Sequence, residues 1–101
     1  MKSISKLEAQ AKEVAEVLKL LSHPKRLLIL CKLSEWAKTV WDLEKECSIS
    51  QSQLSQFLSK MKDENIVSSE KKWLYVTYHI SNDQVQSILK SLVSIYCTSS
   101  L

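Results

Sequence analysis

Glycine is absent from this chain of 101 residues, and proline occurs only once. Without glycine the chain has no Gly-rich loop of the kind that cradles phosphates, which excludes the common nucleotide-binding motifs. Turns and helix ends must therefore use residues such as Asn, Ser, Asp or Lys. Long apolar runs are also missing, since the longest, Leu27 to Cys31, is too short to cross a bilayer. We expect no interaction with the membrane interior.

Net charge and cysteine content narrow the functional class of the protein further. The net charge of +3, from 14 basic and 11 acidic residues, permits nucleic-acid binding without requiring it. The opening residues, MKSISKLEAQAK, lack the apolar stretch of a signal peptide, so we expect a cytoplasmic, reducing location. There, the three cysteines are expected to be free thiols, ligands or redox groups rather than structural disulfides. The length predicts one domain, residues 1–101.

Apolar positions in a first predicted helix, residues 3–22, are spaced alternately three and four apart. Such a heptad seam is typical of a helix that packs against another helix, either in its own core or in a partner subunit. Pro24 then begins a second helix, residues 24–35, which is apolar most of the way round and is therefore predicted to be the central buried helix. The seam consists of Ile4, Leu7, Ala11, Val14, Leu18 and Leu21.

Two short helices separated by a three-residue turn are predicted over residues 39–64, which is a helix-turn-helix unit. Thr39 and Ser50 each precede a helix, and Asp42 and Gln53 follow them three positions later, the pattern of a capping box.

Beyond the helix-turn-helix, the period of the apolar residues changes to two, which predicts a hairpin wing over residues 66–80 with its tip at residues 70–72. Ser81 opens a last helix, residues 83–98, whose two adjacent apolar rows are wide enough to meet both the core and a second subunit. The predicted fold is mainly α with a β-hairpin wing: a winged helix-turn-helix of five helices and two strands, assembled as a two-fold homodimer.

Uncharged polar residues are concentrated at the start of the second helix of the helix-turn-helix, opposite its apolar stripe. That end of the motif enters the major groove of DNA, where Gln can bond adenine and Ser can bond base edges or phosphates. Lysines there and in the wing would attract phosphates regardless of sequence. An ordinary solvated surface is the alternative. The predicted DNA-contacting residues are Gln51, Ser52, Ser55, Gln56, Ser59, Lys60, Lys71 and Lys72.

Two stretches followed by the hairpin carry a resemblance, LKLLSHPKRLLILCKLSE and TVWDLEKECSISQSQLSQFLSKMKDENIV. Over residues 18–97 the chain resembles the ArsR-type winged-helix repressors. Trp41 departs from the small residues common at its position, and the wing tip has no glycine. The resemblance implies a dimeric repressor that binds a pseudo-palindromic operator and dimerises through its first and last helices. The residues expected in the dimer contact are Leu7, Val14, Leu18, Ile88 and Leu92.

Metal-sensing members of this family carry ligands that this chain does not repeat. The Cys-x-Cys positions of arsenic and cadmium sensors fall on Thr39 and Trp41, and Asp83 has no histidine after it. His23 lies at a helix junction, where we expect it to cap a helix. No Cys/His or Ser/His/Asp grouping can be identified, so we expect no enzymatic activity, no cofactor and no bound metal.

Cysteines occur at the two positions that define one branch of the family, which includes the biofilm-growth, HlyU-like and sulfide-responsive repressors. The resemblance implies that Cys31 and Cys97 are linked within one subunit by persulfide or oxidant, and that this releases the operator. From spacing alone such pairing would be weakly supported, since buried free cysteines are common. Cys47 is expected to be a packed residue of the motif's turn. The alternatives are a metal-sensing repressor, a signal-blind DNA-binding dimer and an interaction module without DNA binding.

Overall fold

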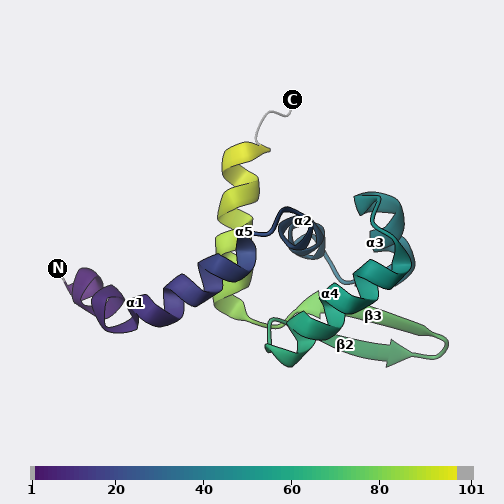
Figure 1. Ribbon diagram of the computed structural model, residues 1–101, viewed down its shortest axis with the longest axis horizontal. Helices are drawn as coiled ribbons and strands as arrows, with labels where there is room; N and C mark the ends of the chain where they lie inside the picture. The colour runs from purple at the N-terminus through teal and green to yellow at the C-terminus, as the bar shows by residue number, and fades with distance from the viewer. Residues whose placement is uncertain (1, 98–101) are drawn as a thin grey trace.

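Five helices and a small antiparallel sheet make up residues 2–97, the part of the chain that the computed structural model describes (Figure 1). This confirms the predicted class, mainly α with a β-hairpin wing. No helix within these residues is both long and apolar enough to cross a membrane. The helices are α1 (Lys2–Leu21), α2 (Pro24–Leu33), α3 (Val40–Cys47), α4 (Gln51–Asp63) and α5 (Asp83–Tyr96). The strands are β1 (Lys38–Thr39), β2 (Val67–Lys72) and β3 (Tyr75–Ile80).

Helix α2 lies at the centre of the domain, seen nearly end-on in Figure 1, and packs against α1, α3, α5 and β3. Ile29 and Leu30 are fully buried, as expected for the central helix, whereas Leu28 on its other side is exposed. The helix ends at Leu33, two residues earlier than predicted, because Ser34 closes it with backbone bonds to carbonyls of the last turn. The core therefore forms around one short apolar helix.

The starts of the helices depend on side-chain caps, and only some of these were predicted correctly. Thr39 forms the complete capping box with Asp42. At Ser50 only half of the predicted box is present: its hydroxyl accepts a bond from the Gln53 N–H at 3.3 Å, but the Gln53 side chain is bonded elsewhere. The prediction that Ser81 opens the last helix is wrong, since Asn82 Oδ1 accepts the bond from the Val85 N–H.

The wing is a hairpin whose turn lies further along the chain than predicted. Lys72 pairs with Tyr75 in the antiparallel register of β2 and β3, so Trp73 and Leu74 form a two-residue turn. The predicted tip, residues 70–72, lies within β2 instead. These residues are polar and exposed, so this end of β2 shows no alternation of apolar residues from which a strand could have been predicted.

A third strand, β1, pairs with β3 on the side opposite β2 and was not predicted. It is only two residues long, which is too short for a period to be visible in the sequence. It joins the start of α3 to the wing, so the helix-turn-helix and the hairpin form one continuous unit.

Left-handed backbone occurs at three residues of the described chain, Ser48, Asn65 and Trp73, with φ between 55° and 62°. Ser48 ends α3 and begins the turn of the helix-turn-helix, and Asn65 follows α4. Asn tolerates this conformation well, but a bulky aromatic residue does so rarely. Because the chain has no glycine, each of these positions carries a side chain.

Candidate DNA-binding face and thiol pair

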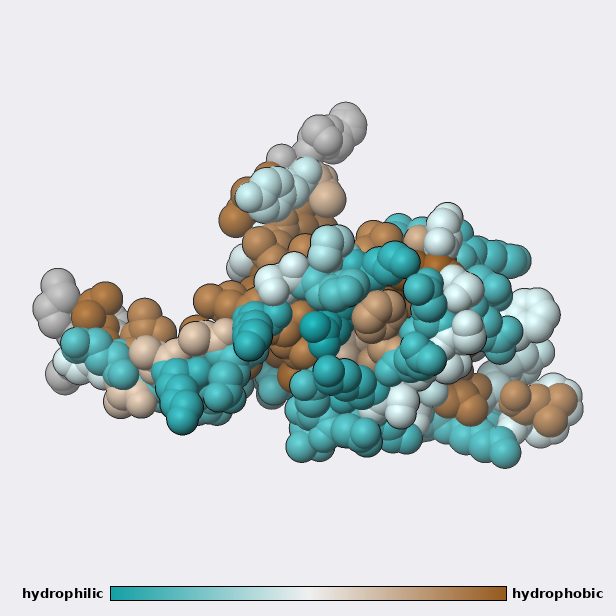
Figure 2. Space-filling model, viewed as in Figure 1, coloured by the Kyte–Doolittle hydropathy of each residue, from teal (hydrophilic) through white to brown (hydrophobic). Residues whose placement is uncertain are grey.

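The polar residues predicted to contact DNA lie together on the outward side of α4, and all of them are exposed. Leu54, Leu58 and Met61, on the opposite side of the helix, are fully buried. Figure 2 shows hydrophilic and near-neutral side chains over this part of the surface. The polar face of α4 consists of Gln51, Ser52, Ser55, Gln56, Ser59 and Lys60.

Contacts from the start of α2 fix the position of α4. Lys25 Nζ donates to Gln53 Oε1 at 3.4 Å, and the His23 ring meets the Phe57 ring edge-on with 5.3 Å between centroids. The prediction that His23 caps a helix is wrong, since its side chain makes no capping bond. Gln53 Oε1 is thereby engaged by Lys25, and Ser52 Oγ on the polar face lies 3.4 Å from Ser50 Oγ.

A second set of contacts joins α4 to the wing. Lys62 Nζ donates to Ser69 Oγ at 2.8 Å, which ties the end of the helix to β2. Lys71 and Lys72 follow on the same strand and are exposed, although Lys72 Nζ lies 3.6 Å from a carboxylate oxygen of Glu70. The predicted lysines of the wing thus lie on a strand that contacts α4.

Two of the three thiols belong to elements that pack together. Cys31 is half-buried on α2, and Cys97 is exposed where it caps the end of α5, the helix packed against α2. Burial, and second the negative charge of a Cys97 thiolate, raise the pKa of Cys31. The two thiols thus lie on, or directly after, helices that contact each other.

The third thiol, Cys47, is buried at the end of α3, as predicted for a packed residue of the motif's turn. Burial raises its pKa, and the positive charge of Lys32 only partly opposes this. All three cysteines are free thiols in this structure. Within residues 2–97, no group of three or more His, Cys, Asp and Glu side chains gathers as metal ligands would.

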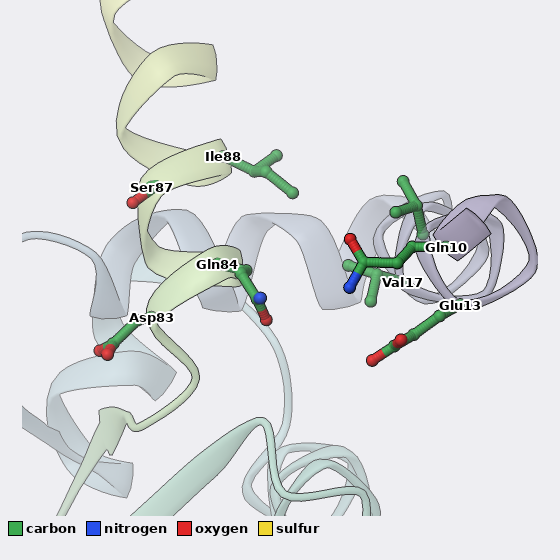
Figure 3. A pocket seen from close by; sticks show the side chains of 8 residues that line it. Gln10, Glu13, Val17, Asp83, Gln84, Ser87 and Ile88 are labelled. Carbon is green, nitrogen blue, oxygen red and sulfur yellow. The ribbon is translucent and has the colours of Figure 1, made fainter. Parts of the chain in front are cut away.

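The residues predicted for the dimer contact lie on α1 and α5. Leu7 and Leu18 are about half exposed at 49% and 52%, while Val14, Ile88 and Leu92 are half-buried. Between α1 and α5 lies an open pocket of about 480 Å³. In Figure 3, Gln84 and Ile88 of α5 point across this pocket toward Gln10 and Val17 of α1. The pocket is lined by Gln10, Glu13, Val14, Val17, Asp83, Gln84, Ser87 and Ile88.

One buried charge beside the motif was not predicted from the sequence. Lys38 is only 1% exposed, and its Nζ lies 3.1 Å and 3.4 Å from carboxylate oxygens of Glu46 and Glu35, and 4.1 Å from the centre of the Trp36 ring. Burial alone would lower the pKa of Lys38, but the two carboxylates outweigh it, so the pKa is raised. No local signal distinguishes this lysine from the exposed ones.

A helix-turn-helix with an exposed polar second helix, followed by a lysine-bearing wing, defines a winged-helix DNA-binding regulator. The profile of the family described as bacterial regulatory proteins of the arsR family matches residues 23–69. The chain is 39% identical to the HTH-type transcriptional regulator YgaV of Escherichia coli strain K12, over 96% of this chain and 99% of the relative. It therefore belongs to the arsR family, and it is a transcriptional regulator rather than an enzyme.

Solved structures agree with this assignment. The transcriptional repressor BigR from Xylella fastidiosa has a TM-score of 0.84 at 33% identity, with 94% of this chain and 97% of that chain covered. Reduced HlyU from Vibrio cholerae N16961 has a TM-score of 0.77 at 30% identity, with 96% and 99% covered. The fold thus extends over nearly the whole length of each protein.

Proposed function

We propose that this chain is a homodimeric repressor that binds a pseudo-palindromic operator and releases it when Cys31 and Cys97 become linked. The observation that carries the proposal is the placement of these two thiols on packed helices, α2 and α5, in a regulator with a free polar face on α4. Similarity to the repressor BigR, and to HlyU in its reduced form, supports it. Because such a regulator acts on chromosomal DNA, we expect it in the cytoplasm.

Recognition of DNA is assigned to the polar face of α4 and to the lysines of the wing. Gln51 and Gln56 are exposed, and each can bond both the N6 and N7 edges of adenine in the major groove. Lys60, Lys71 and Lys72 would neutralise phosphates without selecting a sequence. Since both sets are fixed to one unit, they would engage a half-site together.

Dimerisation is assigned to α1 and α5. Large apolar side chains remain exposed on both helices in the single subunit, among them Ile4 and Leu7 on α1 and Ile95 and Tyr96 on α5. Large apolar side chains exposed in this number on two helices are typical of an interface. A two-fold arrangement would present two α4 helices to half-sites about 34 Å apart, one turn of DNA.

The proposed switch is a two-electron oxidation of two thiols. A Cys97 thiolate attacks the sulfane sulfur of a persulfide and displaces a thiolate, which leaves a persulfide on Cys97. The Cys31 thiolate then attacks the inner sulfur of that group, so that a Cys31–Cys97 disulfide forms and HS⁻ departs. With a peroxide, Cys97 becomes a sulfenic acid and Cys31 displaces water from it. Cys97 is assigned the first step because it is exposed, whereas burial raises the pKa of Cys31.

The Cys31–Cys97 link would change DNA binding by changing the geometry of the dimer. A covalent bond between α2 and the end of α5 ties the central helix to a dimerisation helix, so the two DNA-binding units would be reoriented. Half-site spacing would then no longer fit, and we expect affinity to fall by about 1–3 kcal/mol.

The test is mass spectrometry of persulfide- and peroxide-treated protein, beside a gel shift on the chain's own promoter region. Cys31→Ser and Cys97→Ser are expected to bind DNA but ignore the inducer. Cys47→Ser is the matched control, because Cys47 is buried at the end of α3, and it should respond normally. Release of DNA by either serine variant, or no mass change joining Cys31 to Cys97, would leave a signal-blind or metal-sensing repressor instead.

A further inference from the structure

The tip of the wing is apolar and aromatic, unlike the rest of the surface proposed to face DNA. Trp73 and Leu74 are 79% and 71% exposed, and Tyr75 and Val76 beside them are exposed as well. Figure 1 shows the hairpin projecting past the other elements, and Figure 2 shows brown and pale side chains gathered at that end. Large apolar side chains so far from the core contribute little to folding and mark a contact surface.

The backbone of the turn does not favour the residue that occupies it. Trp73 has φ of 57° at the first position of a two-residue hairpin turn, while Leu74 is not among the residues with positive φ. Glycine is the usual residue at such a position because any Cβ is crowded there. A tryptophan in this conformation is a steric outlier, and outliers of this kind persist mainly at functional positions.

Nothing in the described part of the chain covers this tip. The Trp73 ring meets the Tyr75 ring at 6.3 Å between centroids with a tilt of 57°, so the two rings support each other rather than the core. On the α3 side, an open groove of about 700 Å³ is lined by Trp41 on one side and by Leu74 of the turn and Tyr75 and Val76 of β3 on the other. The tip is therefore presented to a partner.

Charge and continuity identify the kind of partner. Lys71 and Lys72 directly precede the turn, so exposed cations that suit a polyanion lie on one side of the apolar tip, although Lys72 Nζ is 3.6 Å from a Glu70 carboxylate oxygen. The Lys62–Ser69 bond holds the same hairpin to α4, whose polar face is assigned to the major groove. The minor groove of the same DNA duplex matches both features of the tip. Phosphates line its edges, flat base rings lie inside it, and it adjoins the major groove.

We infer that Trp73 and Leu74 form an apolar wedge that enters the minor groove beside each half-site and partly unstacks one base step there, bending the operator. The inference rests on the proposed DNA binding and deepens it, because it adds a contact that selects for deformability. Steps that unstack easily, such as TA and CA, are expected at the wedge position although no side chain reads their edges.

The test compares Trp73→Gly and Trp73→Phe with the wild type on a duplex that the wild-type protein enriches from a random-sequence pool. Bending is measured by energy transfer between dyes at the duplex ends, and unstacking by the fluorescence of 2-aminopurine placed at the predicted step. Trp73→Gly should bind about tenfold more weakly, as expected for loss of an aromatic stack on a base, and should not bend the DNA. Trp73→Phe should keep the bend.

Thermal unfolding separates this role from a structural one. Glycine relieves the crowded turn, so Trp73→Gly should unfold at the same or a higher temperature while its DNA complex weakens. Equal bending and affinity in the wild type and Trp73→Gly would overturn the wedge and leave the proposed DNA binding intact. No binding of any duplex by the reduced wild type would overturn both. Assembly beyond the dimer in sedimentation, abolished by Trp73→Gly, would assign the tip to a protein contact and also overturn the wedge.

Discussion

The two halves of this small domain differ in how completely one subunit buries them. In the half that carries the helix-turn-helix, the inner side of α4 is sealed, with Leu54 and Leu58 fully buried. In the half formed by α1 and α5, Leu7 and Tyr96 remain largely exposed, and α1 extends away from the body in Figure 1. The first half buries the inner side of α4 within one chain, and the second carries the apolar surface that we propose a partner subunit covers.

Shortening a buried side chain in the half that carries the helix-turn-helix should cause the largest loss of stability. Leu58→Ala removes a fully buried side chain from beneath the polar face and leaves a cavity, so we expect a loss of about 2–5 kcal/mol in the free energy of unfolding. Urea unfolding followed by circular dichroism measures it. Leu18→Ala, at a half-exposed position of α1, is the comparison, and an equal loss there under monomeric conditions would contradict the difference between the halves.

Charge placed on the open half should break the dimer and not the fold. Leu7→Glu puts a carboxylate on the heptad seam, and we expect the dimerisation free energy to fall by about 2 kcal/mol or more. Sedimentation at micromolar concentration should show monomers, and operator binding should weaken in parallel. Ala9→Glu, on the other side of α1, is the control. A wild type that is itself fully monomeric at that concentration would overturn the assignment.

In the half proposed to face DNA, substitution of a base-reading residue should change binding in a different way from substitution of a phosphate-binding residue. Gln56→Ala should lose about 1–3 kcal/mol and relax base preference, whereas Lys71→Ala should weaken all sequences alike and reduce the salt slope by about one. Fluorescence anisotropy on operator and scrambled duplexes over a salt series measures both. Gln53→Ala should change little, since that side chain is bonded to Lys25. The same pattern of loss in the Gln56 and Lys71 variants would show that the roles are not separated.

The smallest expected effect is kinetic and concerns the thiols at the boundary of the two halves. Iodoacetamide should label Cys97 first, Cys31 more slowly and Cys47 slowest, because exposure falls in that order and burial raises the pKa of Cys31 and Cys47. A raised pKa means that less thiolate is present at neutral pH, so labelling of Cys31 should keep accelerating with pH past the point at which labelling of an ordinary thiol, with a pKa of about 8.5, levels off. Mass spectrometry of a labelling time course follows each site. Faster labelling of Cys31 than Cys97 at neutral pH would reverse the assigned order of attack.

Local patterns in the sequence determined most of the architecture. The proline at position 24, the caps at Thr39 and Ser50 and the change of period after Asn65 place α2, α3, α4 and the wing, because each signal acts within a few residues of backbone. The polar face of α4 could be identified in the same way, since the helical repeat alone separates it from Leu54 and Leu58.

Only the tertiary structure decided where the hairpin turns and which charge is buried. Strand β2 ends in polar residues that carry no alternation, and pairing of Lys72 with Tyr75 moves the turn to Trp73 and Leu74. Lys38 is buried because Glu35 and Glu46, on either side in the chain, are brought to it by the packing of α2 and α3. Strand register and the burial of a charge both depend on which residues pack together in the folded chain, and no local pattern specifies which partner a strand or a charge will meet.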